Sequence, residues 1–577
     1  MSNKSTTEEL LAKIQELEAK IRYGLVWEEK EPEEVEVLCN TKLPILKEIP
    51  KLCVPPTDPK NLDLFELVDG QKPPLDHLLI EADNYHALKV LQYTHNNKID
   101  VIYIDPPYNT GNKDFVYNDN YVDKEDSFRH SKWLSFMSKR LKMARELMSE
   151  KGVIFISIDD NEQAQLKLLC DQIFGEGNFL GQFIKQSKVG GGSDSKFIVK
   201  EHEYALVYAK NNEYAEGFFI NHEEDYLKRY KEFDEKGRYF WDTFARPGLK
   251  NPINYDVVAP DGTIINGDWI RSKTRFKEDC KNGDIRIIKK SDGKWSVQFK
   301  QRLNIAGKKP RSMTTNFGGT IDGKNDLNEI FAGETVFSYP KSVKYIKTLL
   351  NLINKKDSII LDFMAGSGTT GQAVLELNKE DGGNRQFILI TNNELNGVGS
   401  KLVESEKLKV KSEKFDAEQF GICRRVTRER IKRIIEGYNN SKGNFVEGLS
   451  GNKLRYFRAD FVEPIEEMED ETMLILAENS LEILKIKENC FDLVEKNRAY
   501  AIFRNSENNQ ILAVYWTEDR RKLEEFKQKV EAFDKQTSCY IFSYMVSKFA
   551  NFFDNNAKIT VKDFPEGVYK VLKVNRE

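Results

Sequence analysis

Short runs of consecutive apolar residues, separated by amphipathic stretches, recur through two parts of the chain. Residues 101–104, 359–362 and 386–391 are mostly apolar, which is typical of strands buried on both faces of a parallel sheet. Further strands are expected at 78–84, 153–158, 179–187 and 204–210, and helices at 85–94 and 127–149. The alternation of strand and helix predicts an α/β fold with a mostly parallel sheet.

Other regions depart from this alternation. Residues 8–21 have helical apolar spacing and predict a helix that packs on the body or forms an oligomerisation stripe. Residues 28–75 predict an extended, loop-rich arm. Residues 211–335 combine short β-like runs with many turns, and from 445 onward strand and helix patterns return. The last region predicts a small, separate α/β domain for dimerisation or partner docking.

Composition narrows the class of protein. The 577 residues carry a net charge of −4, so affinity for nucleic acid has to come from a local patch. Residues 271–320 hold 14 Lys or Arg against 4 Asp or Glu, which predicts either a DNA contact or a solvated charged face. Seven scattered cysteines predict reduced thiols and no metal site, and no apolar stretch suggests a signal peptide or a membrane span.

The tetrapeptide Asp105-Pro106-Pro107-Tyr108 directly follows the apolar run at 101–104. Two prolines fix the backbone and end the strand, so Asp105 and Tyr108 are expected at the carboxyl edge of the sheet, where open α/β folds bind ligands. A carboxylate, the carbonyl of Pro106 and an aromatic ring suit an exocyclic amino group on a base, because the oxygens accept its hydrogens while the ring stacks. A plain strand-to-turn connection is the alternative.

A glycine-rich turn follows the second apolar run. It consists of Asp362, Phe363, Met364, Ala365, Gly366, Ser367, Gly368, Thr369 and Thr370, and an apolar helix start comes next. Strand, glycine-rich turn and helix form an arrangement that cradles a nucleotide-like ligand. Glu394 follows the strand at 386–391 and is placed to bind ribose hydroxyls.

Together, these motifs resemble the amino-methyltransferases of DNA, in the permuted (beta) group whose catalytic tetrapeptide precedes the S-adenosylmethionine turn. Within that group the chain looks most like the modification subunit of type III restriction-modification systems, over about residues 1 to 460. One departure is Met364, because the family usually has phenylalanine there. The motifs behind this resemblance lie at 79–88, 105–112, 133–140, 152–159, 202–204 and 337–341.

The resemblance implies a class I, Rossmann-like fold with a mostly parallel seven-stranded sheet and circularly permuted motif order. It implies methyl transfer from S-adenosylmethionine to N6 of an adenine flipped out of duplex DNA, without a metal. Cofactor contacts are then expected from Glu394 and the turn at 362–370, from Tyr339 and Lys341 at the methionine end, and from Asp83 and Asn84, which also suit a helix N-cap.

The predicted organisation has five parts. They are an N-terminal helix and arm (1–75), a catalytic half (76–210), a target recognition domain (211–335), a cofactor half (336–444) and a C-terminal domain (445–577). The expected partners are double-stranded DNA, a second copy of the chain and a helicase-nuclease restriction subunit, in the prokaryotic cytoplasm at the nucleoid. The alternatives are N4-cytosine methylation, a stand-alone adenine enzyme, an RNA or protein target, and a mainly DNA-recognising subunit.

Overall fold

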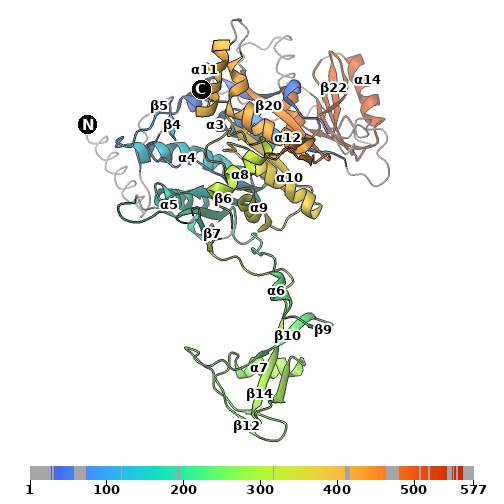
Figure 1. Ribbon diagram of the computed structural model, residues 1–577. Coiled ribbons are helices and arrows are strands. Elements are labelled where there is room, and N and C mark those ends of the chain that lie inside the picture. Colours follow the sequence, from blue (N-terminus) through green and yellow to red (C-terminus); the bar gives the residue numbers. More distant parts are fainter. Residues whose placement is uncertain are drawn as a thin grey trace, which may run out of the picture. The chain divides into compact units, whose positions relative to one another are not determined.

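A computed structural model gives the fold of the chain (Figure 1). It describes residues 27–28, 32–56, 73–112, 114–118, 120–188, 190, 195–315, 317–409, 416–462, 480–505, 509–517, 520–541, 549, 551–553 and 556–562. The predicted helix at 8–21 lies outside these residues. The chain divides into two compact units, Phe218–Pro310 and all the rest.

The larger unit is built on one ten-stranded sheet. Its order is β1-β20-β2-β17-β16-β3-β6-β8-β7-β15. The strands from β20 to β6 run parallel, and β8 is antiparallel to both β6 and β7. The strands in spatial order are β1 (Leu43–Glu48), β20 (Asn452–Val462), β2 (Leu75–Glu81), β17 (Gln386–Thr391), β16 (Ile359–Asp362), β3 (Ile99–Ile104), β6 (Met148–Ile158), β8 (His202–Ala209), β7 (Phe179–Gln186) and β15 (Met313–Thr314).

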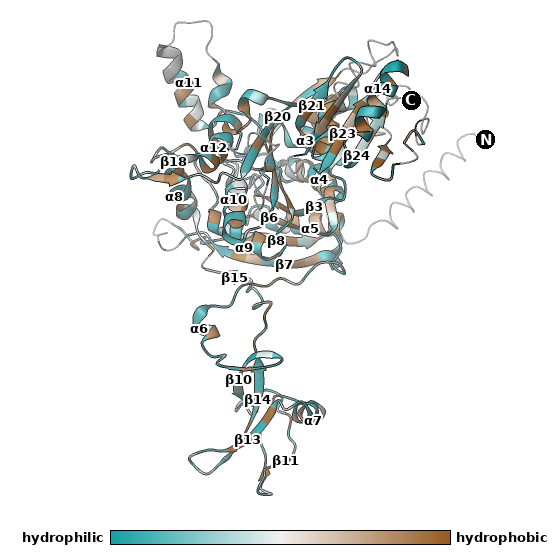
Figure 2. Cartoon of the chain, turned by 90° about the vertical axis from the view of Figure 1, so that its right-hand side faces the viewer, coloured by the Kyte–Doolittle hydropathy of each residue, from teal (hydrophilic) through white to brown (hydrophobic). Residues whose placement is uncertain are grey.

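Two groups of helices pack against this sheet, which confirms the predicted α/β architecture (Figure 1). The central strands are buried, and Figure 2 shows brown, hydrophobic segments among the strands of this sheet. One group is α3 (Asn84–Thr94), α4 (Arg129–Leu147) and α5 (Gln163–Phe174). The other is α8 (Thr320–Ile330), α9 (Val343–Asn351), α10 (Thr369–Asp381) and α12 (Glu429–Glu436). The other elements of this unit between β1 and β20, or just before β1, are α2 (Glu34–Thr41), η1 (Pro50–Leu52), β4 (Val116–Tyr117), β5 (Asn120–Tyr121), η3 (Glu176–Asn178), α11 (Gly397–Lys409), η4 (Ala417–Phe420), η5 (Ile422–Arg428), β18 (Gly437–Asn439) and β19 (Phe445–Glu447).

The sheet extends beyond the seven strands expected from the sequence. We expected an arm at 28–75 and a separate domain from 445 onward, but β1 and β20 come from these regions and join the main sheet. After the tetrapeptide, β4 and β5 form a short hairpin, and Phe115, Tyr117 and Val122 in and beside it are buried. Three helical elements follow one another before β18, namely the 3-10 turn η4, the π-helical segment η5 and α12, and Gly421 separates the first two.

The C-terminal residues form a small mixed sheet, as the sequence pattern predicts. Its strands are β21 (Asp492–Lys496), β22 (Tyr500–Arg504), β23 (Gln510–Tyr515), β24 (Gln536–Ile541) and β25 (Ile559–Lys562), with α14 (Arg520–Glu531). Arg455 of β20 connects it to the main sheet, because its guanidinium lies 2.7 Å from Asp76 and 2.5 Å from Asp492. No helix in the described part of the chain is long and apolar enough to span a membrane.

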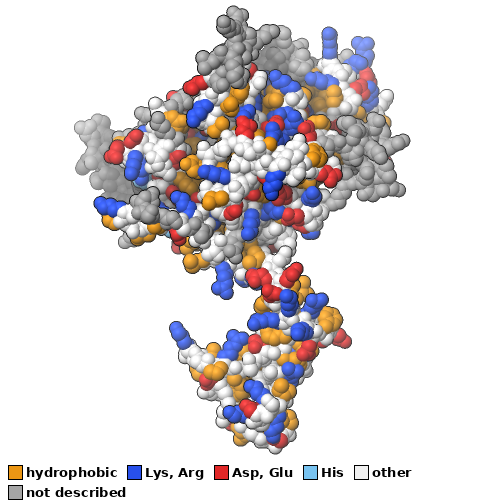
Figure 3. Space-filling model, viewed as in Figure 1, with side chains coloured by type: hydrophobic (Ala, Val, Ile, Leu, Met, Phe, Trp, Pro, Cys, Tyr) orange, Lys and Arg blue, Asp and Glu red, His pale blue; other side chains and the backbone are white. Residues whose placement is uncertain are grey.

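The smaller unit, Phe218–Pro310, has its own core of aromatic and aliphatic side chains around Phe244 and Trp269. Many cations of the predicted basic patch are paired here. Arg302 and Lys300, for example, both bind Asp234, which lies outside residues 271–320. Figure 3 accordingly shows blue and red side chains interspersed on the visible face of this unit. Its elements are α6 (Glu224–Leu227), β9 (Glu232–Asp234), β10 (Gly237–Thr243), β11 (Val257–Val258), β12 (Ile264–Ile265), α7 (Lys273–Lys281), β13 (Ile285–Lys289) and β14 (Trp295–Arg302).

Candidate active site

The two motifs singled out in the sequence meet at one edge of the main sheet. β3 and β16 are parallel neighbours, with Val101 opposite Ile360 and Ile102 opposite Leu361. Asp105 follows β3 and Asp362 ends β16, so both lie at the carboxyl edge, where ligands bind in this class of sheet. We call residues 105–108 the catalytic corner and residues 362–370 the glycine turn.

The catalytic corner is held from behind by α4 and by the residue that follows the corner. Trp133 of α4 is fully buried, and its Nε1 donates to the carbonyl of Pro107 at 2.8 Å. Asn109 adopts a positive φ of 56° and is fully buried, and its Nδ2 donates to Glu162 Oε1 at 2.5 Å. The sequence did not single out Glu162, and Asn109 and Trp133 entered only within the motifs 105–112 and 133–140. These contacts fix the backbone on which Asp105 and Tyr108 stand.

Side chains from two other segments complete the corner. The ammonium of Lys341 lies 3.2 Å from Asp105 Oδ1, 2.9 Å from Glu203 Oε2 and 2.5 Å from the Tyr108 hydroxyl. The Tyr108 hydroxyl also donates to Glu203 Oε2 at 3.3 Å. Glu203 comes from β8, and the sequence named it only as part of the motif 202–204. Side chains far apart in the chain therefore form one compact charged cluster.

One acceptor in this cluster is unused. Asp105 is 28% exposed, but its Oδ1 atom is buried and accepts no hydrogen bond from the described residues. The nearby Lys341 makes an ion pair with this oxygen at an angle that does not form a hydrogen bond. A buried acceptor without a donor is rare and costly, so such an atom is suited to a hydrogen bond from a ligand.

The cluster sets the charge of each member. Burial raises the pKa of Asp105 and the carboxylate of Glu203 adds to this, whereas the ammonium of Lys341 opposes it. Burial also acts to raise the pKa of Glu203, but Lys341 and Lys185 outweigh it and lower that pKa to about 2. Burial acts to lower the pKa of Lys341, and the two carboxylates raise it well above the usual value. Glu203 and Lys341 therefore stay ionised at neutral pH.

The glycine turn has a backbone that requires glycine. Gly366 and Gly368 have φ angles of 48° and 78°, a region that other residues rarely adopt. Asp362 accepts hydrogen bonds from the Met364 N–H at 3.0 Å and from the Thr370 hydroxyl. Burial raises the pKa of the Asp362 carboxyl to about 7. The turn is thereby closed on itself at the start of α10.

The turn is supported from below by η5 and α12. The Thr427 hydroxyl donates to the carbonyl of Gly366 at 2.6 Å. Arg430 is fully buried, and its Nη1 lies 3.1 Å from Ser367 Oγ and 2.9 Å from Thr369 Oγ1. These supports were not predicted, because no sequence motif connects Thr427 and Arg430 with the turn.

The predicted cofactor acids lie on the neighbouring strands. Asp83 follows β2 and caps α3, since its Oδ1 accepts from the Tyr85 N–H at 2.7 Å, while Asn84 Oδ1 accepts from Arg140 Nε at 2.5 Å. Glu394 follows β17, and its pKa is raised by burial and also by the Asp83 charge, so these two acids lie near each other. The structure therefore brings both acids to the edge that carries the glycine turn.

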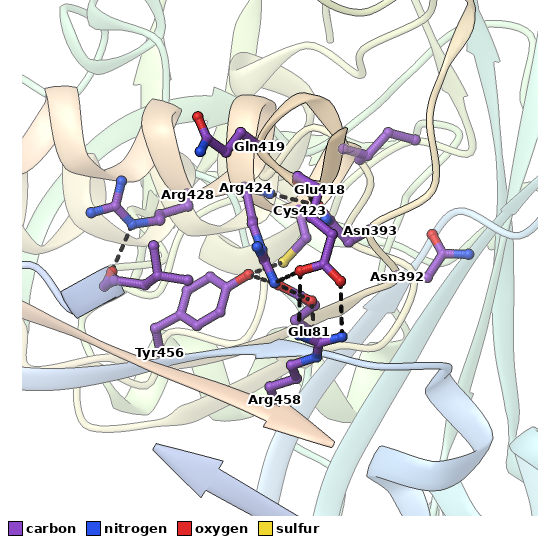
Figure 4. Close-up of polar contacts among 12 residues, drawn as sticks. Glu81, Asn392, Asn393, Glu418, Gln419, Cys423, Arg424, Arg428, Tyr456 and Arg458 are labelled. Carbon is purple, nitrogen blue, oxygen red and sulfur yellow. Dashed lines mark hydrogen bonds and ion pairs between the residues drawn. The ribbon is translucent and has the colours of Figure 1, made fainter. Parts of the chain in front are cut away.

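A polar network stabilises the strand ends from which these acids emerge (Figure 4). Glu81, the last residue of β2, accepts hydrogen bonds from Arg424 at 2.7 and 3.0 Å and from the Tyr456 hydroxyl. The backbone N–H of Arg424 donates to Asn393 Oδ1 at 3.1 Å, just after β17. The network thus ties β2 and β17 to the η5 segment that also supports the turn.

The segment before α9 contacts both halves of the site. Tyr339 is 74% exposed, and the Lys341 side chain reaches the catalytic corner. The cofactor contacts expected of these two residues stay predictions. Phe337 lies near the turn, because its Cζ would be 3.5 Å from a Cβ added to Gly366. The backbone carbonyl of Lys341 accepts from the Thr369 hydroxyl at 3.2 Å, which joins this segment to the turn.

These residues fit S-adenosylmethionine. The turn offers a backbone without side chains at Gly366 and Gly368, and Phe337 offers an aromatic surface beside it. The carboxylates of Asp83 and Glu394 are suited to accept hydrogen bonds from hydroxyl and amino groups. The backbone, the aromatic ring and the two carboxylates thus match the chemical groups of the cofactor.

A comparison with known protein families identifies the family of this chain. A family profile described as DNA methylase matches residues 99–395, just over half of the chain. The chain belongs to the DNA methylase family. This membership confirms the resemblance and the fold class predicted from the sequence, and S-adenosylmethionine is the methyl donor expected for the family.

Several relatives within the methylase family cover part of the chain. The Mod subunit of the type III restriction-modification enzyme StyLTI from Salmonella typhimurium is 36% identical over 345 residues, covering 55% of this chain and 52% of that protein. The EcoPI Mod subunit from Escherichia phage P1 is 35% identical, covering 55% and 58%. The type II methyltransferase M.KpnI from Klebsiella pneumoniae is 33% identical, covering 54% and 79%. The chain thus spans little more than half the length of the two Mod relatives.

Proposed function

We propose that the chain transfers a methyl group from S-adenosylmethionine to N6 of an adenine flipped out of duplex DNA. The observation that carries this proposal is the buried, unbonded Oδ1 of Asp105 beside Tyr108, at the edge shared with the glycine turn. An exocyclic amino group is a donor that fits this acceptor, and adenine carries such a group.

Each residue of the catalytic corner then has a task. Asp105 and the carbonyl of Pro106 accept the two hydrogens of the amino group, which keeps its lone pair directed at the methyl donor. Tyr108 stacks on the base and offsets part of the cost of flipping, which is a few kcal/mol. Trp133 and Asn109 hold this geometry, so that positioning supplies much of the acceleration.

The second half of the site orients the methyl donor. Asp83, Glu394 and the glycine turn are the residues that would hold S-adenosylmethionine, which supplies an electrophilic methyl group when bound. The turn lies beside the catalytic corner because β16 and β3 are neighbours. The methyl donor and the target base are thereby bound side by side, which is why the reaction requires both motifs.

We further propose that the chain is the modification and DNA-recognition subunit of a type III restriction-modification system. The relatives named StyLTI Mod and EcoPI Mod support this reading. The unit Phe218–Pro310 is folded around its own core, and in the sequence it lies between the catalytic corner and the glycine turn. We assign it as the target recognition domain. A homodimer, a helicase-nuclease partner and a docking role for the C-terminal sheet stay predictions.

The test is to identify the modified base and its context together. DNA from cells that express the chain is sequenced by a single-molecule method and digested to nucleosides for mass spectrometry, with cells expressing Asp105→Ala as the background. We expect N6-methyladenine in one short sequence context. N4-methylcytosine would support the cytosine alternative, and unmodified DNA would contradict the proposal.

The subunit assignment has a separate test. We expect a helicase-nuclease protein from the same cells to co-purify with the full chain. Replacing cations of the Phe218–Pro310 unit should alter or weaken the methylated context while the methylated base stays the same. If the context did not respond to any change in this unit, its recognition role would be wrong.

A further inference from the structure

Lys341 has hydrogen-bonding capacity that its protein contacts do not use. A lysine ammonium carries three protons. Two are taken by Glu203 Oε2 at 2.9 Å and by the Tyr108 hydroxyl at 2.5 Å. For the third, the described residues provide no acceptor at hydrogen-bonding geometry, since Asp105 Oδ1 lies 3.2 Å away at an unsuitable angle. A free donor therefore lies directly beside the free acceptor of Asp105.

The position of this ammonium leaves the face of Tyr108 accessible. Nζ lies 4.8 Å from the centroid of the Tyr108 ring but 2.5 Å from its hydroxyl oxygen. These two distances place it at the hydroxyl end of the ring and not above the centre. A base stacked on Tyr108 would thus meet Lys341 and Asp105 at its edge.

The donor and acceptor match one kind of base edge. In adenine, the amino group at C6 has a ring nitrogen acceptor beside it on either side, N1 or N7. An amino hydrogen on Asp105 and a ring nitrogen on Lys341 would satisfy both free groups at once. Guanine and thymine present a carbonyl oxygen where adenine has its amino group, and that oxygen would face the carboxylate of Asp105 without a proton between them.

We infer that Lys341 binds the target base, by donating a hydrogen bond to the ring nitrogen next to the methylated amino group, and that Glu203 positions it for this contact. The inference rests on the proposed function and goes beyond it, because it assigns Lys341 to the substrate instead of the cofactor. Glu203 serves as an anchor on β8 that holds both the ammonium and the Tyr108 hydroxyl. The carbonyl of Lys341 is held by Thr369 of the glycine turn, so both halves of the site place this lysine.

The test replaces single atoms of the substrate. Duplexes containing the methylated context carry adenine, 1-deazaadenine or 7-deazaadenine at the target position, and single-turnover methylation is measured with saturating S-adenosylmethionine. For the unaltered chain, we expect one of the two analogues to react about 10 to 100 times more slowly, which is typical of losing a hydrogen bond to a charged group.

The variant Lys341→Met separates this contact from the intrinsic effect of the analogue. We expect it to methylate ordinary adenine about 10 to 100 times more slowly, and the same analogue to cost it less than about twofold further. Its affinity for S-adenosylmethionine, measured by equilibrium dialysis, should stay within about threefold, which also shows that the variant is folded. Equal analogue penalties in both proteins, or a lost affinity for the cofactor, would overturn the inference.

Two further variants test the positioning role. Glu203→Gln weakens the anchor, so we expect it to lose part of the discrimination between adenine and the analogue. Lys185→Met removes a second buried lysine, whose ammonium is 3.9 Å from Glu203. Lys185 does not contact Asp105 at hydrogen-bonding distance, so this matched control should keep the full discrimination even if its rate is lower. Equal losses in both variants would refute a specific role for Glu203. If unaltered chain did not methylate the ordinary duplex, the proposed function would fail first, and the inference with it.

Discussion

The catalytic corner and the glycine turn leave neighbouring strands at the same edge of the sheet, but they are stabilised differently. The turn is closed by its own backbone and by Thr427 and Arg430 beneath it. The corner is built from charged side chains of three separate segments, and it keeps an unused donor and an unused acceptor. The turn is therefore a preformed support that depends on conformation, whereas the corner depends on charge and on a ligand that completes it.

The largest effect is expected from removing the acceptor of the corner. Asp105→Ala removes the carboxylate that we propose accepts a hydrogen bond from the amino group of the base. Methyl transfer should therefore fall by about 10³-fold or more. Affinity for S-adenosylmethionine should change little, because the turn stays intact. Transfer of tritium from labelled cofactor to DNA measures the rate, and equilibrium dialysis measures the affinity. A rate equal to that of the unaltered chain would remove Asp105 from the mechanism.

A substitution that strains the backbone of the turn should have the opposite effect to Asp105→Ala. It should weaken cofactor binding more than it slows methyl transfer. Gly368→Ala forces a φ of 78° on alanine, and its Cβ would lie 3.1 Å from Thr427 Cγ2. We expect the Kd for S-adenosylmethionine to rise about tenfold or more, because Thr427 also holds the Gly366 carbonyl. The rate of methyl transfer at saturating cofactor should change less than this Kd.

Gly382→Ala is the matched control for this change. Gly382 ends the same helix, α10, with a φ of 68°, and nothing lies within 4 Å of an added Cβ. Both variants carry a similar backbone strain of about 1–2 kcal/mol, which thermal unfolding measures. Only Gly368→Ala should lose cofactor affinity. If both variants bound the cofactor equally well, the turn would not be the conformational support that we describe.

The pH dependence of the rate tests whether charge governs the corner. The carboxylate of Asp105 is the reactive form, and burial raises its pKa above the usual value of about 3.9. Activity should therefore be lost as pH falls through this raised pKa, by about tenfold per pH unit below it. Lys341 lowers this pKa, so Lys341→Met should move the loss to higher pH. The ionisable groups that face Asp105 are Lys341, Glu203, Tyr108, Tyr103, Tyr345, Lys185 and Asp362.

Two of these groups could be mistaken for Asp105 and are readily separated. Glu203 has a pKa of about 2, so its carboxylate stays charged over the pH values at which Asp105 is titrated. Asp362 has a pKa of about 7, but it belongs to the turn, so its titration should affect cofactor affinity and disappear from rates measured at saturating cofactor. If Lys341→Met lost activity at the same low pH as the unaltered chain, the proposed effect of Lys341 on the pKa of Asp105 would be wrong.

The same contrast explains what the sequence could predict. Continuous apolar runs such as 101–104 and 359–362 determine buried strands locally, and the glycines between them determine the turn, so both motifs and the fold class were accessible. The pairing of Glu203 with Lys341 was not, because no periodicity connects polar residues 138 positions apart. The edge strand β1 and its neighbour β20 were missed for a related reason. They follow or precede irregular segments, and only long-range pairing places them in the sheet.

The smallest effect is expected from removing the hydroxyl of Tyr108. This change separates the contribution of the hydroxyl, which bonds to charged groups, from that of the ring, which stacks on the base. Tyr108→Phe keeps the ring that stacks on the base but loses the hydrogen bonds to Glu203 and Lys341. Both partners are charged, but these hydrogen bonds position the corner and do not contact the base, so we expect only a partial loss of about 2- to 10-fold in methyl transfer. Tyr108→Ala also removes the ring and should cost about 5- to 150-fold, the range for base stacking on an aromatic side chain. Both rates are measured in single turnovers with saturating cofactor and DNA. Equal losses in the two variants would mean that the hydroxyl, through Lys341 and Glu203, matters more than stacking, and the corner would then act by charge alone.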